Sequence, residues 1–147
     1  MAKYFVWSEF TRSTRSVELC INNEPFSDVI QDNILELMKV MDVIREAWTY
    51  YCKENYYEDP RIFITSGYRS FALNQALNGS PTSAHRIGAA CDFEAANGHN
   101  EDLFKVANEV LNVHNIPFDQ LIDENNYDWI HLGLKNDDDE RRKMIMH

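Results

Sequence analysis

The sequence predicts an α+β domain, with a small and mainly antiparallel sheet and helices packed on it. Three observations predict this class. A long stretch in the first half of the chain has helical periodicity, most of the short β-branched runs come after it, and the last two runs are separated by a four-residue turn. Such a turn joins antiparallel strands. The 147 residues fit a single domain spanning 1–147, with 135–147 as a polar tail.

The helices are predicted from apolar residues that recur every three or four positions. The longest covers about residues 32–55, and either Asp32 or Asn33 can cap its N-terminus. A short helix at 70–77 and a third at 100–113 follow. We expect the apolar face of the longest helix to pack into the core; its residues are Ile34, Leu37, Met38, Met41, Ile44, Trp48 and Tyr51.

The strands are predicted from short apolar and β-branched runs bounded by turn-forming residues. The segment 78–83 is rich in turn residues and reads as a loop. The segment 125–128, with the sequence NNYD, predicts the turn of a hairpin. The four expected strands are 61–65, 89–95, 118–124 and 129–134.

The composition excludes two classes of function. Acidic residues outnumber basic residues by 24 to 14, so the formal net charge is −10. Phosphate binding needs a basic face, and we therefore expect no nucleic-acid partner. No apolar run approaches the ~18 residues of a membrane-spanning helix, so we expect no membrane insertion.

The cysteines and the first residues of the chain indicate the cellular compartment in which the protein is made. Cys20, Cys52 and Cys91 are odd in number and lack CxxC spacing, which predicts reduced thiols. The first residues contain no apolar segment of the kind found in secretory signals, so we expect no signal peptide and synthesis in the cytoplasm. No motif for a partner protein is legible, and we expect a monomer.

Three residues form the candidate site: His85, Asp92 and His131. Asp92 stands among apolar residues of a predicted strand, where a carboxylate is costly to bury unless it is paired or bound to a metal. Two imidazoles and one carboxylate are a normal ligand set for a catalytic zinc, with a fourth position left for water. Gly88 allows a tight backbone turn between the first two ligands.

The same residues also fit a purely structural interpretation. Asp92 could cap a turn, and both histidines could be satisfied within the core; spacing alone leaves this alternative open. Cys91 is adjacent to Asp92 but on the opposite strand face, so we expect it to pack rather than to bind a metal.

A series of short motifs occurs in a fixed order along the chain: FVWSEFTRS (5–13), SGYRS (66–70), Asn74, SAHRIGAACD (83–92), FDQLI (118–122) and WIH (129–131). This series resembles the M15 zinc peptidases, the D-alanyl-D-alanine carboxypeptidase group, and especially its short phage and prophage branch. The resemblance covers about residues 4–134. It implies a hedgehog/DD-peptidase-like fold and a single zinc peptidase domain.

The resemblance implies roles for individual residues. It implies that His85, Asp92 and His131 bind Zn2+. Arg69, in the SGYRS motif, would meet the substrate's carboxylate or steady a developing oxyanion, because its planar guanidinium is always charged.

Other residues near these motifs are candidates for binding the substrate and for transferring the proton. Ser83 and Gln120 are candidates for binding the substrate, although Ser83 equally fits a role as a loop cap. Two residues are candidates for the general base. Asp128 stands three residues before His131, whereas Glu124 shares a strand face with Gln120. The phage-type branch favours Glu124 narrowly, and both remain candidates.

The expected function is zinc-dependent hydrolysis of short cell-wall peptides, the peptidoglycan stem peptides, by a carboxypeptidase or an endopeptidase. Without a signal peptide, the protein would reach the wall through lysis or a phage-encoded pore. The main alternative is a catalytically inactive zinc-containing module that binds wall peptides or a phage or partner protein. A phage assembly component that keeps the site only as a scaffold is a third class.

Overall fold

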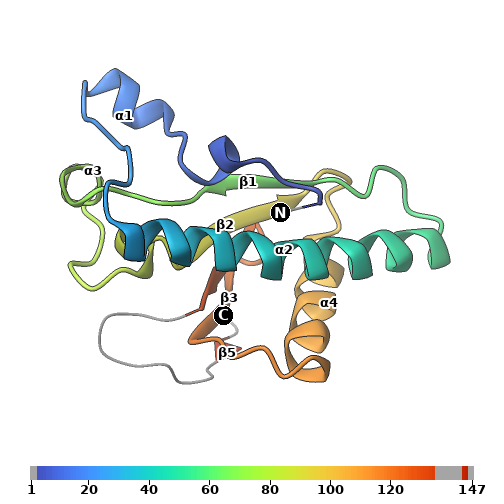
Figure 1. Cartoon of the computed structure of the whole chain (residues 1–147). Coiled ribbons are helices and arrows are strands. Elements are labelled where there is room, and N and C mark those ends of the chain that lie inside the picture. Colours follow the sequence, from blue (N-terminus) through green and yellow to red (C-terminus); the bar gives the residue numbers. More distant parts are fainter. Residues whose placement is uncertain (1–2, 135–143, 146–147) are drawn as a thin grey trace.

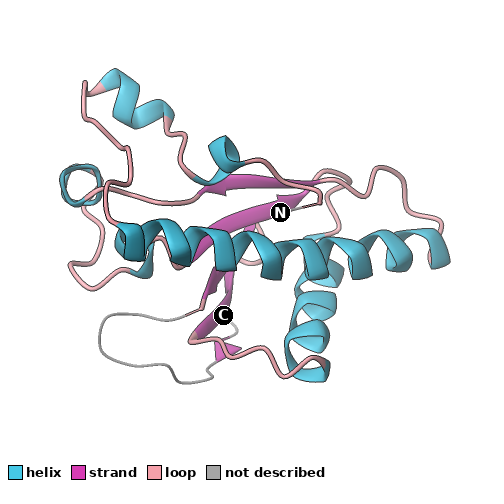
Figure 2. Ribbon diagram, in the orientation of Figure 1, coloured by secondary structure: helices cyan, strands magenta, loops and turns pink. Residues whose placement is uncertain are grey.

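The computed structural model describes residues 3–134 and 144–145 and consists of a twisted sheet with helices packed against it (Figures 1 and 2). Four strands pair in an antiparallel manner, and β5 pairs with β3 in parallel, in the order β1-β2-β4-β3-β5. This arrangement confirms the predicted α+β class. The elements are η1 (Trp7–Phe10), α1 (Thr14–Glu18), α2 (Asp28–Glu54), β1 (Ile62–Ser66), α3 (Phe71–Ala76), η2 (Ala84–Ile87), β2 (Ala90–Ala95), α4 (Asn100–Val113), β3 (Gln120–Glu124), β4 (Trp129–Gly133) and β5 (Met144–Ile145).

The core lies between one face of the sheet and the helices α2 and α4. Strand β2 shows why: Cys91 and Phe93 are fully buried and face the helices, whereas Asp92 between them points to the other face. The apolar stripe predicted for the long helix is buried in the same core, including Trp48, except for Tyr51, which is partly buried against it. The sheet therefore has an apolar face that holds the fold together and a second face that is free to carry polar side chains.

The long helix starts earlier than the sequence predicted. It begins at Asp28 with Ser27 as its N-cap residue, and the Ser27 side chain makes no capping hydrogen bond. The expectation that Asp32 or Asn33 caps this helix was therefore wrong. Asn33 instead lies on the buried face and donates a 2.8 Å hydrogen bond to the carbonyl of Ile87, which satisfies its amide without a cap.

The hairpin and the short helix lie where the sequence predicted them. Asn125, Asn126 and Tyr127 adopt left-handed backbone conformations in the turn between β3 and β4, and asparagine tolerates this region well. Helix α3 is capped by Ser70, whose hydroxyl accepts from the Leu73 N–H at 3.2 Å. The hairpin fixes β4 next to β3 and so sets the position of the WIH motif.

The N-terminal segment contains two short helices, η1 and α1, that the sequence did not predict. Figure 1 shows both short helices, in blue, in the upper part of the view, with η1 next to β1. The Tyr68 N–H donates to the Phe10 carbonyl at 2.7 Å, which ties the segment to the loop after β1. Most of the predicted polar tail lies outside the described residues. Among the described helices, none combines the length and the apolar character needed to cross a bilayer.

Candidate active site

Three elements bring His85, Asp92 and His131 together. His85 comes from η2, Asp92 from β2 and His131 from β4. One ligand atom from each residue lies within 4.8 Å of the other two. Residues separated by up to 46 positions in the chain therefore converge on one point, on the sheet face away from the core.

Asp92 and His131 are placed by strand pairing. They are direct cross-strand neighbours of β2 and β4, and His131 Nδ1 lies 2.9 Å from Asp92 Oδ1. The same row across the sheet continues to Ser66 on β1 and to Ile122 on β3. Because side chains of paired residues share a face, the sheet register alone brings these two groups together.

His85 is placed by a turn rather than by a strand. Its Nδ1 lies 2.7 Å from the Gly67 carbonyl oxygen, which can only accept, so Nδ1 carries the proton. The lone pair of Nε2 is then free, and Nε2 lies 3.5 Å from Asp92 Oδ1. A histidine that binds a metal characteristically donates its other ring N–H in this way.

The turn that carries His85 is held by contacts on both sides. The His85 N–H donates to the Ser83 hydroxyl at 3.2 Å, so Ser83 does act as a loop cap. Gly88 ends η2 at a φ of +74°, and a Cβ there would lie 2.7 Å from Cγ1 of Ile34 and 2.9 Å from the carbonyl of Ile30. A side chain at this position would collide with α2, which explains the glycine.

The environment keeps Asp92 ionised. Burial opposes the charged form, but the hydrogen bond with His131 and the nearby imidazole of His85 outweigh it and hold the pKa of the Asp92 carboxyl well below its usual range. A carboxylate oxygen and two imidazole nitrogens then face one another, which is the donor set of a catalytic zinc. The side chains present therefore fit a divalent metal.

Arg69 lies beside the three residues. Its Nη2 is 3.9 Å from Asp92 Oδ2 and donates to the Ser66 hydroxyl at 3.3 Å. Its backbone N–H donates to the His85 carbonyl at 3.0 Å, which couples the loop after β1 to η2. Within the described residues, the buried Nε of Arg69 has no partner. The structure thus places this predicted residue next to the candidate metal-binding group.

A cavity of about 270 Å³ opens on the other side of His131. The predicted residues Ser83, Gln120 and Glu124 line it together with His131. Gln120 and Glu124 flank Ile122 on β3, which is the cross-strand neighbour of His131. The sequence analysis gave no role to Asp119, a buried residue of the same cavity that lies within the FDQLI motif, between Phe118 and Gln120.

Asp128 is placed differently from Glu124. It is exposed in the hairpin turn, its carboxylate accepts a hydrogen bond from the Asn125 amide, and it does not line the cavity beside His131. Two other histidines are also remote from the group: His99 stacks on Tyr57, and His114 is exposed on the far end of α4.

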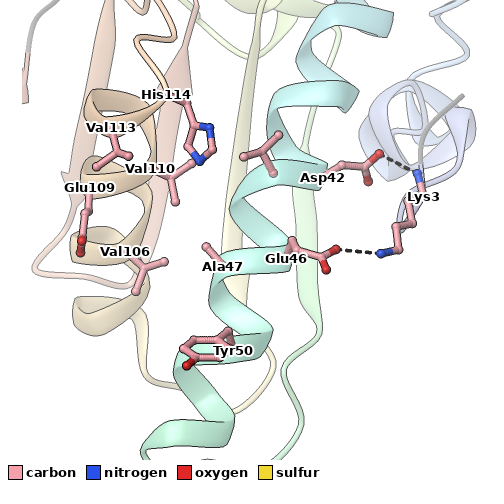
Figure 3. A pocket seen from close by; sticks show the side chains of 11 residues that line it. Lys3, Asp42, Glu46, Ala47, Tyr50, Val106, Glu109, Val110, Val113 and His114 are labelled. Atoms are coloured by element: carbon pink, nitrogen blue, oxygen red, sulfur yellow. Dashed lines mark hydrogen bonds and ion pairs between the residues drawn. The ribbon is translucent and has the colours of Figure 1, made fainter.

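Two further cavities were not predicted from the sequence. One, of about 730 Å³, lies between α2 and α4 and shares no residue with the site. Figure 3 shows the valines of α4 on one side of it and Lys3 beside α2, hydrogen-bonded to Asp42 and Glu46. The other, of about 680 Å³, is lined by the N-terminal segment together with Ser66 and Arg69. Only the second adjoins the candidate site.

The chain matches a known protein family. The family described as Peptidase M15 matches residues 3–133. The chain belongs to the peptidase M15 family. The matched range contains all three residues of the candidate metal group, and M15 is a family of metallopeptidases. The resemblance identified from the short motifs is thus confirmed, and no curated protein matches the chain.

Proposed function

We propose that this M15 family member is a zinc-dependent peptidase that hydrolyses short peptides of the bacterial cell wall. The observation that carries the proposal is the convergence of His85 Nε2, Asp92 Oδ1 and His131 Nδ1, with His85 oriented by the Gly67 carbonyl. These three atoms would hold the ion. Zinc bound in such a site polarises a carbonyl and lowers the pKa of water from 15.7 to about 7.

Side chains of the protein itself would stabilise the developing charge, transfer the proton and bind the substrate. The substrate's scissile carbonyl would lie near Arg69, whose guanidinium stabilises negative charge that develops on the carbonyl oxygen. Glu124 would take a proton from the attacking water and deliver it to the leaving amine. Ser83 and Gln120, on the wall of the same cavity as Glu124, would hydrogen-bond the peptide backbone.

The choice of Glu124 as general base rests on its place in the cavity beside His131. Asp128 is exposed and its carboxylate is engaged by Asn125 within the turn. We expect Glu124→Gln to lower kcat by roughly 10²–10⁴-fold, because general acid–base catalysis contributes that much. Asp128→Asn is the matched control, and it should change kcat by less than about threefold with bound zinc unchanged in both variants. The reverse pattern would assign the base to Asp128.

The overall activity is tested on purified peptidoglycan. We expect the zinc-loaded protein to release peptide fragments, a chelator to stop this release, and added zinc to restore it. Mass spectrometry of the fragments locates the bond that is cut and separates a carboxypeptidase from an endopeptidase. Digestion that survives complete removal of the metal, or no digestion after zinc is restored, would contradict the proposal.

A further inference from the structure

We propose that the cavity next to Arg69 binds the C-terminal carboxylate of the peptide substrate, and that Arg12 of the N-terminal segment is the residue that recognises it together with Arg69. The inference rests on the proposed function and extends it, because it assigns the protein a preference for peptides that end near the cleaved bond. Such a preference defines a carboxypeptidase.

The cavity lies directly beside the metal-binding group. Ser66 and Arg69 both line it, Ser66 is the cross-strand neighbour of Asp92, and Arg69 Nη2 is 3.9 Å from Asp92 Oδ2. Its volume of about 680 Å³ is more than twice that of the cavity beside Glu124. A peptide whose scissile bond lies at the His–Asp–His group therefore has room to extend into this space.

The walls of the cavity are rich in cationic and hydroxyl groups. Three arginines line it in a chain whose net charge is −10, and Glu24 is the one acidic residue among the described lining residues. Its serines and threonines add neutral donors; they are Ser8, Thr11, Ser13, Thr14, Ser16, Thr65 and Ser66. This combination suits an anionic group, because guanidinium forms strong charge-assisted hydrogen bonds with a carboxylate.

Two of the three guanidinium groups lie along the same strand. Arg12 Nη2 donates to the Ile64 carbonyl at 3.4 Å, and Arg69 Nη2 donates to the Ser66 hydroxyl at 3.3 Å. Ile64 and Ser66 are two residues apart on β1, which is about 7 Å along a strand. Arg15, by contrast, forms an exposed 2.7 Å ion pair with Glu18.

The N-terminal segment is attached firmly enough to place Arg12 relative to Arg69. The buried Asn23 donates to the carbonyls of Thr11 and Tyr68, at 2.8 and 3.0 Å, and accepts from the Ser70 N–H at 2.7 Å. These bonds join the residue before Arg12 to the residues on both sides of Arg69. Gly67 allows the same contact, because a Cβ there would overlap the Phe10 carbonyl.

The opposite flank of the site has the opposite charge. The cavity beside His131 contains Asp119 and Glu124 and no basic residue other than His131 among its described lining residues. A terminal carboxylate would be repelled from that flank and attracted to the arginines. The charge distribution therefore orients the peptide, with its carboxyl end toward Arg12.

The test compares three peptide probes in binding measurements by calorimetry. The probes are N-acetyl-lysyl-D-alanyl-D-alanine as the free acid, the same peptide as its C-terminal amide, and that amide with glutamate in place of lysine. All measurements use the full chain with Glu124→Gln to slow cleavage, both zinc-loaded and after chelation. The chelated protein makes the readout independent of activity, since the contact with arginine needs no metal.

We expect the free acid to bind about tenfold or more tightly than either amide, and Arg12→Ala to remove most of this preference. Arg12→Lys should restore part of it. Arg61→Ala is the matched control: it removes the same charge from a residue that pairs with Asp59 and lines neither cavity, and it should keep the preference. Circular dichroism checks that each variant is folded.

Three results would overturn the inference: equal binding of the free acid and its amide, a preference that survives Arg12→Ala, or no binding of any probe. Tight binding of the glutamate-containing amide would also overturn it, because the carboxylate recognised would then belong to a side chain. Digestion of peptidoglycan by the wild-type protein is measured separately. The carboxylate preference can thus fail while the peptidase activity stands, and the activity can fail while the preference stands.

Discussion

The candidate metal ligands are held in two different ways. Asp92 and His131 are opposite each other on paired strands, so every backbone hydrogen bond between β2 and β4 helps to keep them together. His85 lies on a single 3-10 turn whose position depends on Ser83, on the Gly67 carbonyl and on the packing of Gly88 against α2. The pair on the sheet is thus a property of the fold, whereas the third ligand is brought to it by contacts from distant segments.

The largest effect is expected from the strand-held pair. His131→Ala removes one of three donor atoms and leaves Asp92 without its 2.9 Å partner, so zinc affinity should fall on the order of a hundred- to a thousandfold. The fold should persist, because the alanine keeps the backbone pairing with Ile122. Elemental analysis of the purified protein measures bound zinc, and far-ultraviolet circular dichroism measures the fold.

The matched control for this variant is His114→Ala, which removes an exposed histidine on α4 that is outside the group. It should leave the zinc content unchanged. A stoichiometric amount of zinc in His131→Ala would show that the ligand set is wrong.

The position of His85, the candidate ligand on the turn, should be sensitive to a substitution at a residue that is not itself a ligand. Gly88→Ala strains a left-handed backbone position and drives a methyl group into Ile34 and the Ile30 carbonyl. We expect the free energy of unfolding to fall by roughly 2–4 kcal/mol and zinc affinity to fall with it, because η2 must move away from α2. Chemical denaturation and zinc titration measure the two effects.

Gly98→Ala separates the collision from the backbone strain. Gly98 also has a positive φ, of +82°, but a Cβ there would meet nothing within 4 Å. It should lower the free energy of unfolding by only about 1 kcal/mol and leave zinc affinity unchanged. Equal effects of the two variants on zinc affinity would mean that packing against α2 does not position His85.

The strand-held part of the site could be predicted from the sequence because its signals are local. A carboxylate within an apolar strand marks Asp92, and the turn residues of 125–128 predict the hairpin that places His131. The start of α2 was predicted too late because Asp32 and Asn33 offer the same kind of N-cap residue as Ser27, the one that precedes the helix in the structure.

The surroundings of His85 and Arg69 could not be predicted in the same way. Asn33 reaches the Ile87 carbonyl across 54 positions, and Asn23 reaches Tyr68 and Ser70 across 45 and 47 positions. An asparagine in a sequence does not show which distant backbone group it will bond. The cavity lined by the N-terminal segment depends on these bonds, which is why it emerged only from the structure.

Among the changes that act on the site itself, the smallest effect should come from Asn33→Ala, which tests whether α2 positions the turn through this side chain. The variant removes the 2.8 Å hydrogen bond to the Ile87 carbonyl. We expect a loss of about 1 kcal/mol in the free energy of unfolding and a decrease in zinc affinity of less than about tenfold. Chemical denaturation and zinc titration measure both quantities, and NMR of the imidazole groups reports on each histidine separately.

The NMR signals make this variant informative even though its effect is small. The resonances of His85 should shift, because the turn loses one of its anchors, whereas those of His131 should stay in place, because its strand pairing with Asp92 is untouched. Asn112→Ala, which removes an exposed side-chain amide that donates to Asn108 within α4, should shift neither. Equal shifts of both histidines in Asn33→Ala would show that the three ligands move as one unit and that the distinction between strand-held and turn-held ligands does not hold.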